Sequence, residues 1–208
     1  MTDAQLAPRL GFVLPGDWWH VDLTSEQTAQ ADARALSRAL GGRSDERAQV
    51  RHQLEGYVLQ AGRKAREAKA SDFYFALEML PGVPIPASLA VYWPEVPFGL
   101  SIEAGAQVAA HSLASTIQRK DPVAEIETWG DAGDAVIRVA KKLAGPIARS
   151  AGIAADAELS VTYWLIRKGT SGPALLQFTT QLVDEAEHMI TLFDAIVGTV
   201  AWTEPDPS

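Results

Sequence analysis

The stretch that decides the fold runs from residue 159 to residue 202, LSVTYWLIRKGTSGPALLQFTTQLVDEAEHMITLFDAIVGTVAW. Between Leu159 and Lys168 large apolar side chains occupy both alternating faces, which is typical of an interior strand that is covered on each side. The turn-forming residues 169–173 should return the chain into a second strand, over residues 175–180. The sequence therefore predicts an antiparallel hairpin inside a sheet.

Beyond this hairpin the apolar period changes from that of a strand to that of a helix. One helical stripe is formed by Val183, Ala186, Met189, Ile190, Phe193, Ile196, Val197 and Val200. Asp184 and Glu185 are expected in the first turn, where carboxylates complement the positive end of the helix dipole. An amphipathic helix followed by Trp202 therefore completes the stretch.

The rest of the chain is expected to extend this sheet and to add helices. Alternating apolar side chains predict strands over 12–14, 18–23, 72–80, 87–93, 125–129 and 134–142, and helical patterns predict helices over 24–40, 44–68 and 102–117. The turn at Pro15, Gly16 and Asp17 predicts a small hairpin or a kinked edge strand. Residues 146–157 are expected to form a loop or short helix. We expect one domain over residues 1–202, with a loose lead-in over 1–10 and a disordered tail over 203–208.

Composition excludes several functional classes. The chain has 208 residues, of which 47% are hydrophobic and 21% charged, as in ordinary globular proteins. A formal charge of −8 argues against nucleic-acid binding, which needs clustered positive charge. The chain has no cysteine, which excludes disulfides and zinc–cysteine sites. Because no basic region precedes a long apolar run at the N-terminus, we expect neither a secretory signal nor a membrane span, and a cytoplasmic location.

No catalytic motif is present in the sequence. The chain contains neither the nucleophile elbow G-x-S-x-G nor the phosphate-binding patterns G-x-x-x-x-G-K-[ST] and G-x-G-x-x-G, so we predict no enzyme activity and no cofactor. Glu185 and His188 have the spacing of half a di-metal carboxylate site. A second such pair on another helix is missing, so no metal is predicted. His52 and His111 have no convergent partner in the sequence.

Aromatic residues are the other candidates for function. The six tryptophans are Trp18, Trp19, Trp93, Trp129, Trp164 and Trp202. Trp18 and Trp19 must point to opposite faces of a strand, so one is expected in the core and the other exposed or covered by the first helix. One interpretation is that all six are structural. In the other, an exposed aromatic beside the proline-rich connector 81–86 anchors a partner. The candidate interaction residues are Trp18, Trp19, His20, Tyr92 and Trp93.

Five segments together resemble a group of uncharacterised proteins from high-GC Gram-positive (actinobacterial) bacteria. They are PGDWWHVDL at 15–23, PGVPIPASL at 81–89, TYWL at 162–165, LLQFTTQL at 175–182 and LFDAIVGTVAW at 192–202. That group is similar to the PsbP-like fold. The resemblance implies the α+β class, with an α/β/α sandwich whose central, mainly antiparallel sheet of about six or more strands is flanked by helices. It also implies a protein that acts by docking to other proteins.

Two functional hypotheses follow. The first is a cytoplasmic, non-catalytic module that binds another protein or associates with itself. The alternative is a small-ligand-binding protein or hydrolase with a pocket between the sheet and the helices, using Tyr57, Tyr74 or His111. A deep pocket that contains a residue with a shifted pKa would favour the alternative. A filled sheet face would favour the first.

Overall fold

The computed structural model describes residues 9–41, 48–78, 85–94, 104–144, 157–170 and 172–203. The elements, in chain order, are β1 Arg9–Gly11, β2 Asp17–His20, α1 Glu26–Gly41, α2 Ala48–Glu67, β3 Asp72–Glu78, β4 Ala87–Tyr92, α3 Ala106–Lys120, β5 Glu125–Gly130, β6 Asp134–Ala144, β7 Ala157–Arg167, β8 Ala174–Thr180, α5 Ala186–Val197 and β9 Ala201–Thr203. Of the predicted segment 146–157 only Ala157 is described, as the first residue of β7, and most of the connector 81–86 lies outside the described residues.

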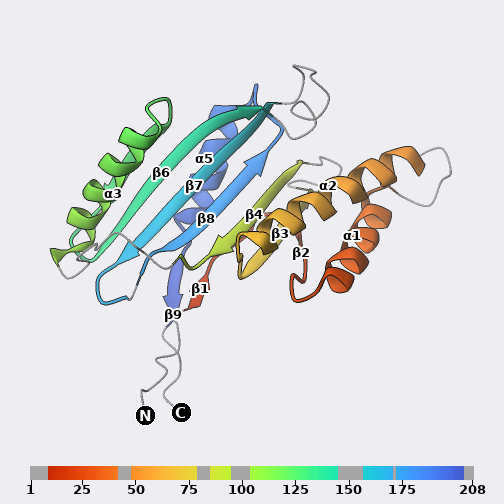
Figure 1. Cartoon of the computed structure of the whole chain (residues 1–208), viewed down its shortest axis with the longest axis horizontal. Coiled ribbons are helices and arrows are strands. Elements are labelled where there is room, and N and C mark those ends of the chain that lie inside the picture. The colour runs from red at the N-terminus through yellow and green to blue at the C-terminus, as the bar shows by residue number, and fades with distance from the viewer. Residues whose placement is uncertain are drawn as a thin grey trace, which may run out of the picture.

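A seven-stranded sheet in the order β2-β3-β4-β8-β7-β6-β5 forms the centre of the molecule, and every neighbouring pair is antiparallel. In Figure 1, α1, α2 and α3 lie in front of this sheet and α5 lies behind it. The predicted hairpin is β7–β8, in the interior of the sheet. The α+β class, with an antiparallel sheet of more than six strands flanked by helices, is therefore confirmed.

The core on the α5 side is built around aromatic rings. Phe193 of α5 stacks on Phe178 of β8 with ring centroids 4.5 Å apart, and Tyr163 of β7 meets Phe178 edge-on at 5.7 Å. All three side chains are fully buried. Because offset and edge-on ring pairs are the favoured aromatic geometries, these contacts fix α5 on the middle of the sheet.

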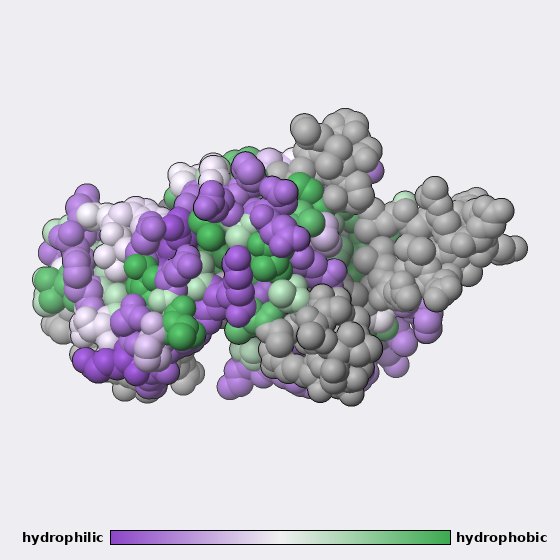
Figure 2. All heavy atoms as spheres, turned by 90° about the horizontal axis from the view of Figure 1, so that it is seen from above, coloured by the Kyte–Doolittle hydropathy of each residue, from purple (hydrophilic) through white to green (hydrophobic). Residues whose placement is uncertain are grey.

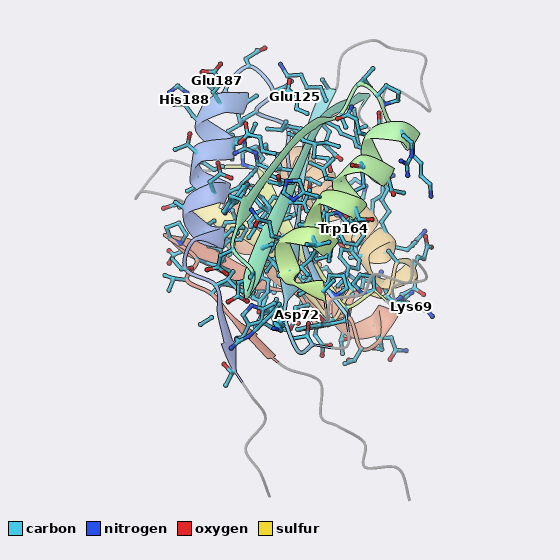
Figure 3. The ribbon with its side chains drawn as sticks, turned by 90° about the vertical axis from the view of Figure 1, so that its left-hand side faces the viewer. Lys69, Asp72, Glu125, Trp164, Glu187 and His188 are labelled. Atoms are coloured by element: carbon cyan, nitrogen blue, oxygen red, sulfur yellow. The ribbon has the colours of Figure 1, made fainter. Side chains whose placement is uncertain are left out.

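The opposite face of the sheet has two separate helical covers. The α3 cluster joins Leu113 to Ile137 and Ile166 of the sheet, and Trp164 lies beneath this helix (Figure 3). The α1–α2 cluster joins Leu36 and Val58 to strands β2–β4. Seen from above in Figure 2, a notch separates the lobe containing α3 from the rest of this side. Among the described elements, β8 therefore runs between the two covers.

Strand β1 forms a small second sheet with β9, in the register Arg9↔Thr203 to Gly11↔Ala201. The predicted strand over 12–14 and its hairpin with residues 18–23 are wrong. Phe12 and Leu14 pack against the α5 core, and Val13 N donates to Thr199 Oγ1 at 2.9 Å. The alternating pattern correctly indicated burial, but it carried no information about which segment is the neighbour. Thr203 belongs to β9, one residue into the predicted tail.

Two predicted helices begin later than the patterns indicated. The helix α5 starts at Ala186, because Leu182 N donates to Thr180 Oγ1 and Val183 N to Gln181 O, which ties the preceding residues into turns. The helix α3 starts after Gly105, whose φ of 116° is not helical. Of the described helices, none combines the length and apolar character needed to cross a bilayer.

Substitution of Gly130 tests the turn that joins β5 to β6, and substitution of Gly56 in α2 provides a comparison. Gly130 has a φ of +117°, and an added Cβ would lie 2.2 Å from the carbonyl oxygen of Asp134. We expect Gly130→Ala to lower the free energy of unfolding by at least about 2 kcal/mol. Gly56 lies in α2 with nothing within 4 Å of an added Cβ, so Gly56→Ala should raise the same free energy by about 0.5–1 kcal/mol. Urea denaturation measures both, and equal stabilities of the two variants would contradict the described turn.

Candidate functional site

The predicted interaction residues are distributed over both faces of the sheet. Trp18 packs against the α5 core and Trp19 against the α1–α2 core, so the prediction that they face opposite ways is confirmed. The indole N–H of Trp18 donates to the carbonyl of Pro15 at 2.9 Å. Both side chains are partly buried, and neither is an exposed aromatic anchor.

Tyr92, Trp93 and His20 lie in three different surroundings. Tyr92 packs on the α1–α2 side, where burial raises the pKa of its phenol. Trp93 meets Trp202 edge-on with ring centroids 6.0 Å apart, on the α5 side. His20 is exposed at the edge of the sheet, with its Nε2 3.5 Å from Asp72 Oδ1. A role of these residues in partner binding remains a prediction.

The histidine candidates lie on helix surfaces. His188 Nδ1 lies 2.9 Å from Glu185 Oε2, and both side chains are exposed at the start of α5. His111 Nδ1 is 2.8 Å from the carbonyl of Gln107 in its own helix, and His52 is exposed on α2. Within the described ranges, no three His, Cys, Asp or Glu side chains gather as metal ligands would.

The two described residues of the pocket hypothesis, Tyr74 and His111, lie on opposite sides of the sheet. Tyr74 packs on the α5 side of the sheet, where its ring meets that of Phe12 edge-on at 5.7 Å. His111 lies on α3, which covers the opposite side. The side chain of Tyr57 lies outside the described residues. Tyr74 and His111, which the pocket hypothesis names as alternatives, therefore do not line one pocket together.

The one described tryptophan that is substantially exposed is Trp129, at 39%, on strand β5. Its ring meets Tyr163 edge-on at 6.4 Å, and the guanidinium of Arg138 lies 6.0 Å from its centroid. One side of the indole therefore rests on the protein while the other faces solvent. Cation–π contacts of this kind hold an aromatic ring in a fixed orientation.

A polar network supports Trp129 from below. Arg138, only 15% exposed, donates to Glu127 Oε2 at 2.8 Å and also to Asp194 Oδ2 of α5. The phenol of Tyr163 donates to Asp194 Oδ1 at 2.7 Å. Burial, and then the neighbouring Asp194, raise the pKa of Tyr163 far above its ordinary value, so the phenol remains a hydrogen-bond donor. The network connects α5 to the sheet next to the edge strand β5.

Sequence reasoning missed this network, although one signal was present. Arg138 lies between Val136 and Ala140 on the same face of β6, and a charged residue in such a buried row needs a partner of opposite charge. Its partner, Asp194, is not one of the apolar residues that form the stripe of α5. Nothing in the local pattern connects two residues that lie 56 positions apart.

Strand β5 is at the end of the sheet, and in the described part of the chain it pairs only with β6. Asp131 N donates to Asp134 O, and on the far side of β6 Lys168 N donates to Gly133 O. Because alternate residues of an antiparallel strand bond to opposite neighbours, Ile126, Thr128 and Gly130 direct their N–H and C=O groups away from β6. Figure 3 shows this edge of the sheet between α3 and α5.

The free edge is acidic. Glu125 and Glu127 alternate with Trp129 on the α5 side of β5, Asp131 follows in the turn, and Asp134 begins β6, where Arg167 Nε lies 3.9 Å from its Oδ1. Glu125 lies near one end of the edge in Figure 3, and the side chain of Glu127 is 66% exposed. The edge therefore combines backbone groups that have no strand partner among the described residues, one aromatic ring and negative charge.

Comparisons with known proteins give weak similarities only. No family model matches the chain, and no curated protein sequence does. The solution structure of cyanobacterial PsbP (CyanoP) from Synechocystis is 11% identical, with a TM-score of 0.39 over 97% of this chain and 95% of that chain. The Ran-binding protein Mog1p of Saccharomyces cerevisiae is 10% identical, with a TM-score of 0.37 over 62% of this chain and 77% of that chain. Similarity at this level supports no functional argument.

Replacing Tyr163 tests the network. Tyr163→Phe removes a hydrogen bond to a carboxylate, and such bonds contribute about 1.5–3 kcal/mol to stability. Because the Asp194 side chain is 34% exposed and can turn to water, we expect a loss of about 1.5 kcal/mol, measured by urea denaturation at neutral pH. Tyr92→Phe is the matched control, since its hydroxyl has no partner among the described residues, and it should change stability by less than about 0.5 kcal/mol.

The stability that Tyr163 supplies should also depend on pH. Its pKa is raised in the folded protein, whereas a tyrosine in the unfolded chain ionises near about pH 10. The contribution is therefore complete below that pH and is lost as the pH rises above it. The stability difference between wild type and Tyr163→Phe should shrink between about pH 9 and about pH 11. A difference that stays constant over this range would show that the phenol does not act as described.

Proposed function

We propose that the protein is a non-catalytic binding module that accepts an extended segment of a partner protein along the outer edge of β5. The observation that carries this proposal is the exposed ring of Trp129 beside three residues whose backbone groups point outward. Strand addition at such an edge gives affinity through main-chain hydrogen bonds, while side-chain contacts give specificity. Trp129 supplies the aromatic anchor that such interfaces use.

The charge of the edge indicates the chemistry of the partner. Alternate side chains of an added strand would lie beside Glu125, Glu127 and Trp129, so lysine or arginine at these positions would be attracted and acidic residues repelled. An arginine could also stack on the free side of the Trp129 ring. The formal charge of −8 adds long-range attraction for a basic segment. We therefore propose a basic partner segment.

A second copy of the chain fits the edge less well. Two β5 strands paired with each other would bring Glu125 and Glu127 of both copies to the same face of the joined sheet. Like charges at adjacent strands are destabilising. The lack of a chemical activity, the cytoplasmic location and the actinobacterial relationship remain predictions from the sequence.

Peptide binding tests this proposal. We expect extended peptides of about eight residues with alternating lysine or arginine to bind the wild-type protein. Thr128→Pro removes an outward N–H without breaking the β5–β6 ladder and should abolish binding. Glu125→Lys should weaken binding about tenfold, equivalent to about 1.4 kcal/mol. Fluorescence anisotropy measures the affinities, and circular dichroism confirms that the variants are folded.

Matched controls separate the edge from general effects. Glu67→Lys on α2 makes the same charge change as Glu125→Lys, and Val108→Ala removes an exposed apolar group from α3. Both variants should bind the peptides as the wild type does. Equal binding by Thr128→Pro, or a preference for acidic peptides, would contradict the proposal.

A further inference from the structure

A cleft opens on the face of the sheet that carries two helical covers, between α2 and strands β4, β7 and β8. It has a volume of about 230 Å³. It lies on the opposite side of the sheet from Trp129, and the inference drawn from it does not depend on the proposed function. The cleft confirms that a pocket lies between the sheet and a long helix, although Tyr74 and His111 are not among its lining residues.

Short side chains keep the cleft open. Ala61 and Ala65 of α2 face the cleft, and Ala90 of β4 lies below them. A helix that packed fully on this part of the sheet would place larger apolar groups there, because interiors are close-packed. Phe73 and Tyr92 provide ring surface on the same side. The inner wall is therefore apolar without filling the space.

The floor of the cleft is polar. Ser88 Oγ, on a residue that is only 4% exposed, and Thr179 Oγ1 lie 2.6 Å apart and share one hydrogen bond. The two hydroxyls carry two O–H donors, so one remains to donate to a ligand. Gln177 Nε2 donates to Ser160 Oγ at 3.3 Å, which leaves the Gln177 carbonyl oxygen to accept. The buried Ser88 and the partly buried Thr179 and Gln177 favour an occupant that can form hydrogen bonds.

Opposite charges stand at the rim of the cleft. Lys64 lies on α2 and Glu158 on β7, and both line the space. Within the part of the chain that the structure describes, neither has an ion-pair partner. A ligand with one negative and one positive group would satisfy both, whereas a ligand with a single charge would satisfy one.

We propose that this cleft binds a small zwitterion of amino-acid size. The carboxylate lies against Lys64, the ammonium group against Glu158 and the apolar side chain against Phe73 and Tyr92. The volume corresponds to about eight water molecules at about 30 Å³ each, which suits a ligand of about eight to ten non-hydrogen atoms. Ser88, Thr179 and Gln177 supply hydrogen bonds from below.

Leucine and two analogues test the assignment of charges. The first analogue, 3-methylbutylamine, lacks the carboxylate, and the second, 4-methylpentanoate, lacks the ammonium group. Two-dimensional NMR titration of the wild-type protein should show leucine binding at least about tenfold more tightly than either analogue, with shifts at Ala90 and Gln177. Lys64→Gln should remove the preference for leucine over the amine. Glu158→Gln should remove its preference over the acid.

The controls use charged residues that lie outside the cleft. Lys142→Gln on β6 and Glu67→Gln on α2 should leave all three affinities unchanged. Ala61→Met should fill the cleft and abolish binding of leucine. Thr128→Pro should bind leucine normally, which separates this site from the β5 edge. The proposal is overturned if leucine causes no shifts at Ala90 and Gln177, if either analogue binds as tightly as leucine, or if Lys64→Gln and Glu158→Gln keep the wild-type preferences.

Discussion

Strand β7 must bury apolar side chains on both of its faces, and the rest of the structure depends on that constraint. Val161, Tyr163 and Leu165 point toward α5, while Ile166 and Trp164 point toward α3. A strand of this kind has no face that can remain in water, so it must lie inside a sheet and have a helix on either side. The longest pairing of the sheet, with β6, and the pairing with β8 both follow from this position.

Local periodicity predicted most of the elements, and apart from helix and strand boundaries its failures concern which segments become neighbours. The hairpin β7–β8, the helices α1 and α2 and the strands of the sheet could be read from alternation and helical stripes, because those patterns report burial of one face. The same patterns do not say what covers that face. Phe12 and Leu14 pack against the α5 core, and Arg138 of β6 meets Asp194 of α5, so neither contact could be derived from neighbouring residues.

The positions of the two candidate sites also could not be derived from local sequence patterns. Trp129 was one of six tryptophans in the sequence, and its exposure follows from β5 being the last strand of the sheet. The cleft exists because α2 and α3 cover the same face but leave β8 between them. The polar row in the cleft was visible in the sequence only as serine, threonine and glutamine at alternate strand positions, which is equally typical of a solvated face. One site lies at the last strand of the sheet, and the other lies where the helical cover of one face is interrupted. Both positions depend on the order of the strands in the sheet.

The pairing of β1 with β9 has a consequence for the order in which the molecule assembles and opens. Its supporting contact from Val13 to Thr199 spans 186 residues, so it forms only after the large sheet has brought the two segments together. The small sheet has three residue pairs and lies below the large sheet in Figure 1, at the end of α5. We expect such a closure to open as a separate cooperative unit, so that its amide hydrogens exchange with solvent while those of β7 remain protected.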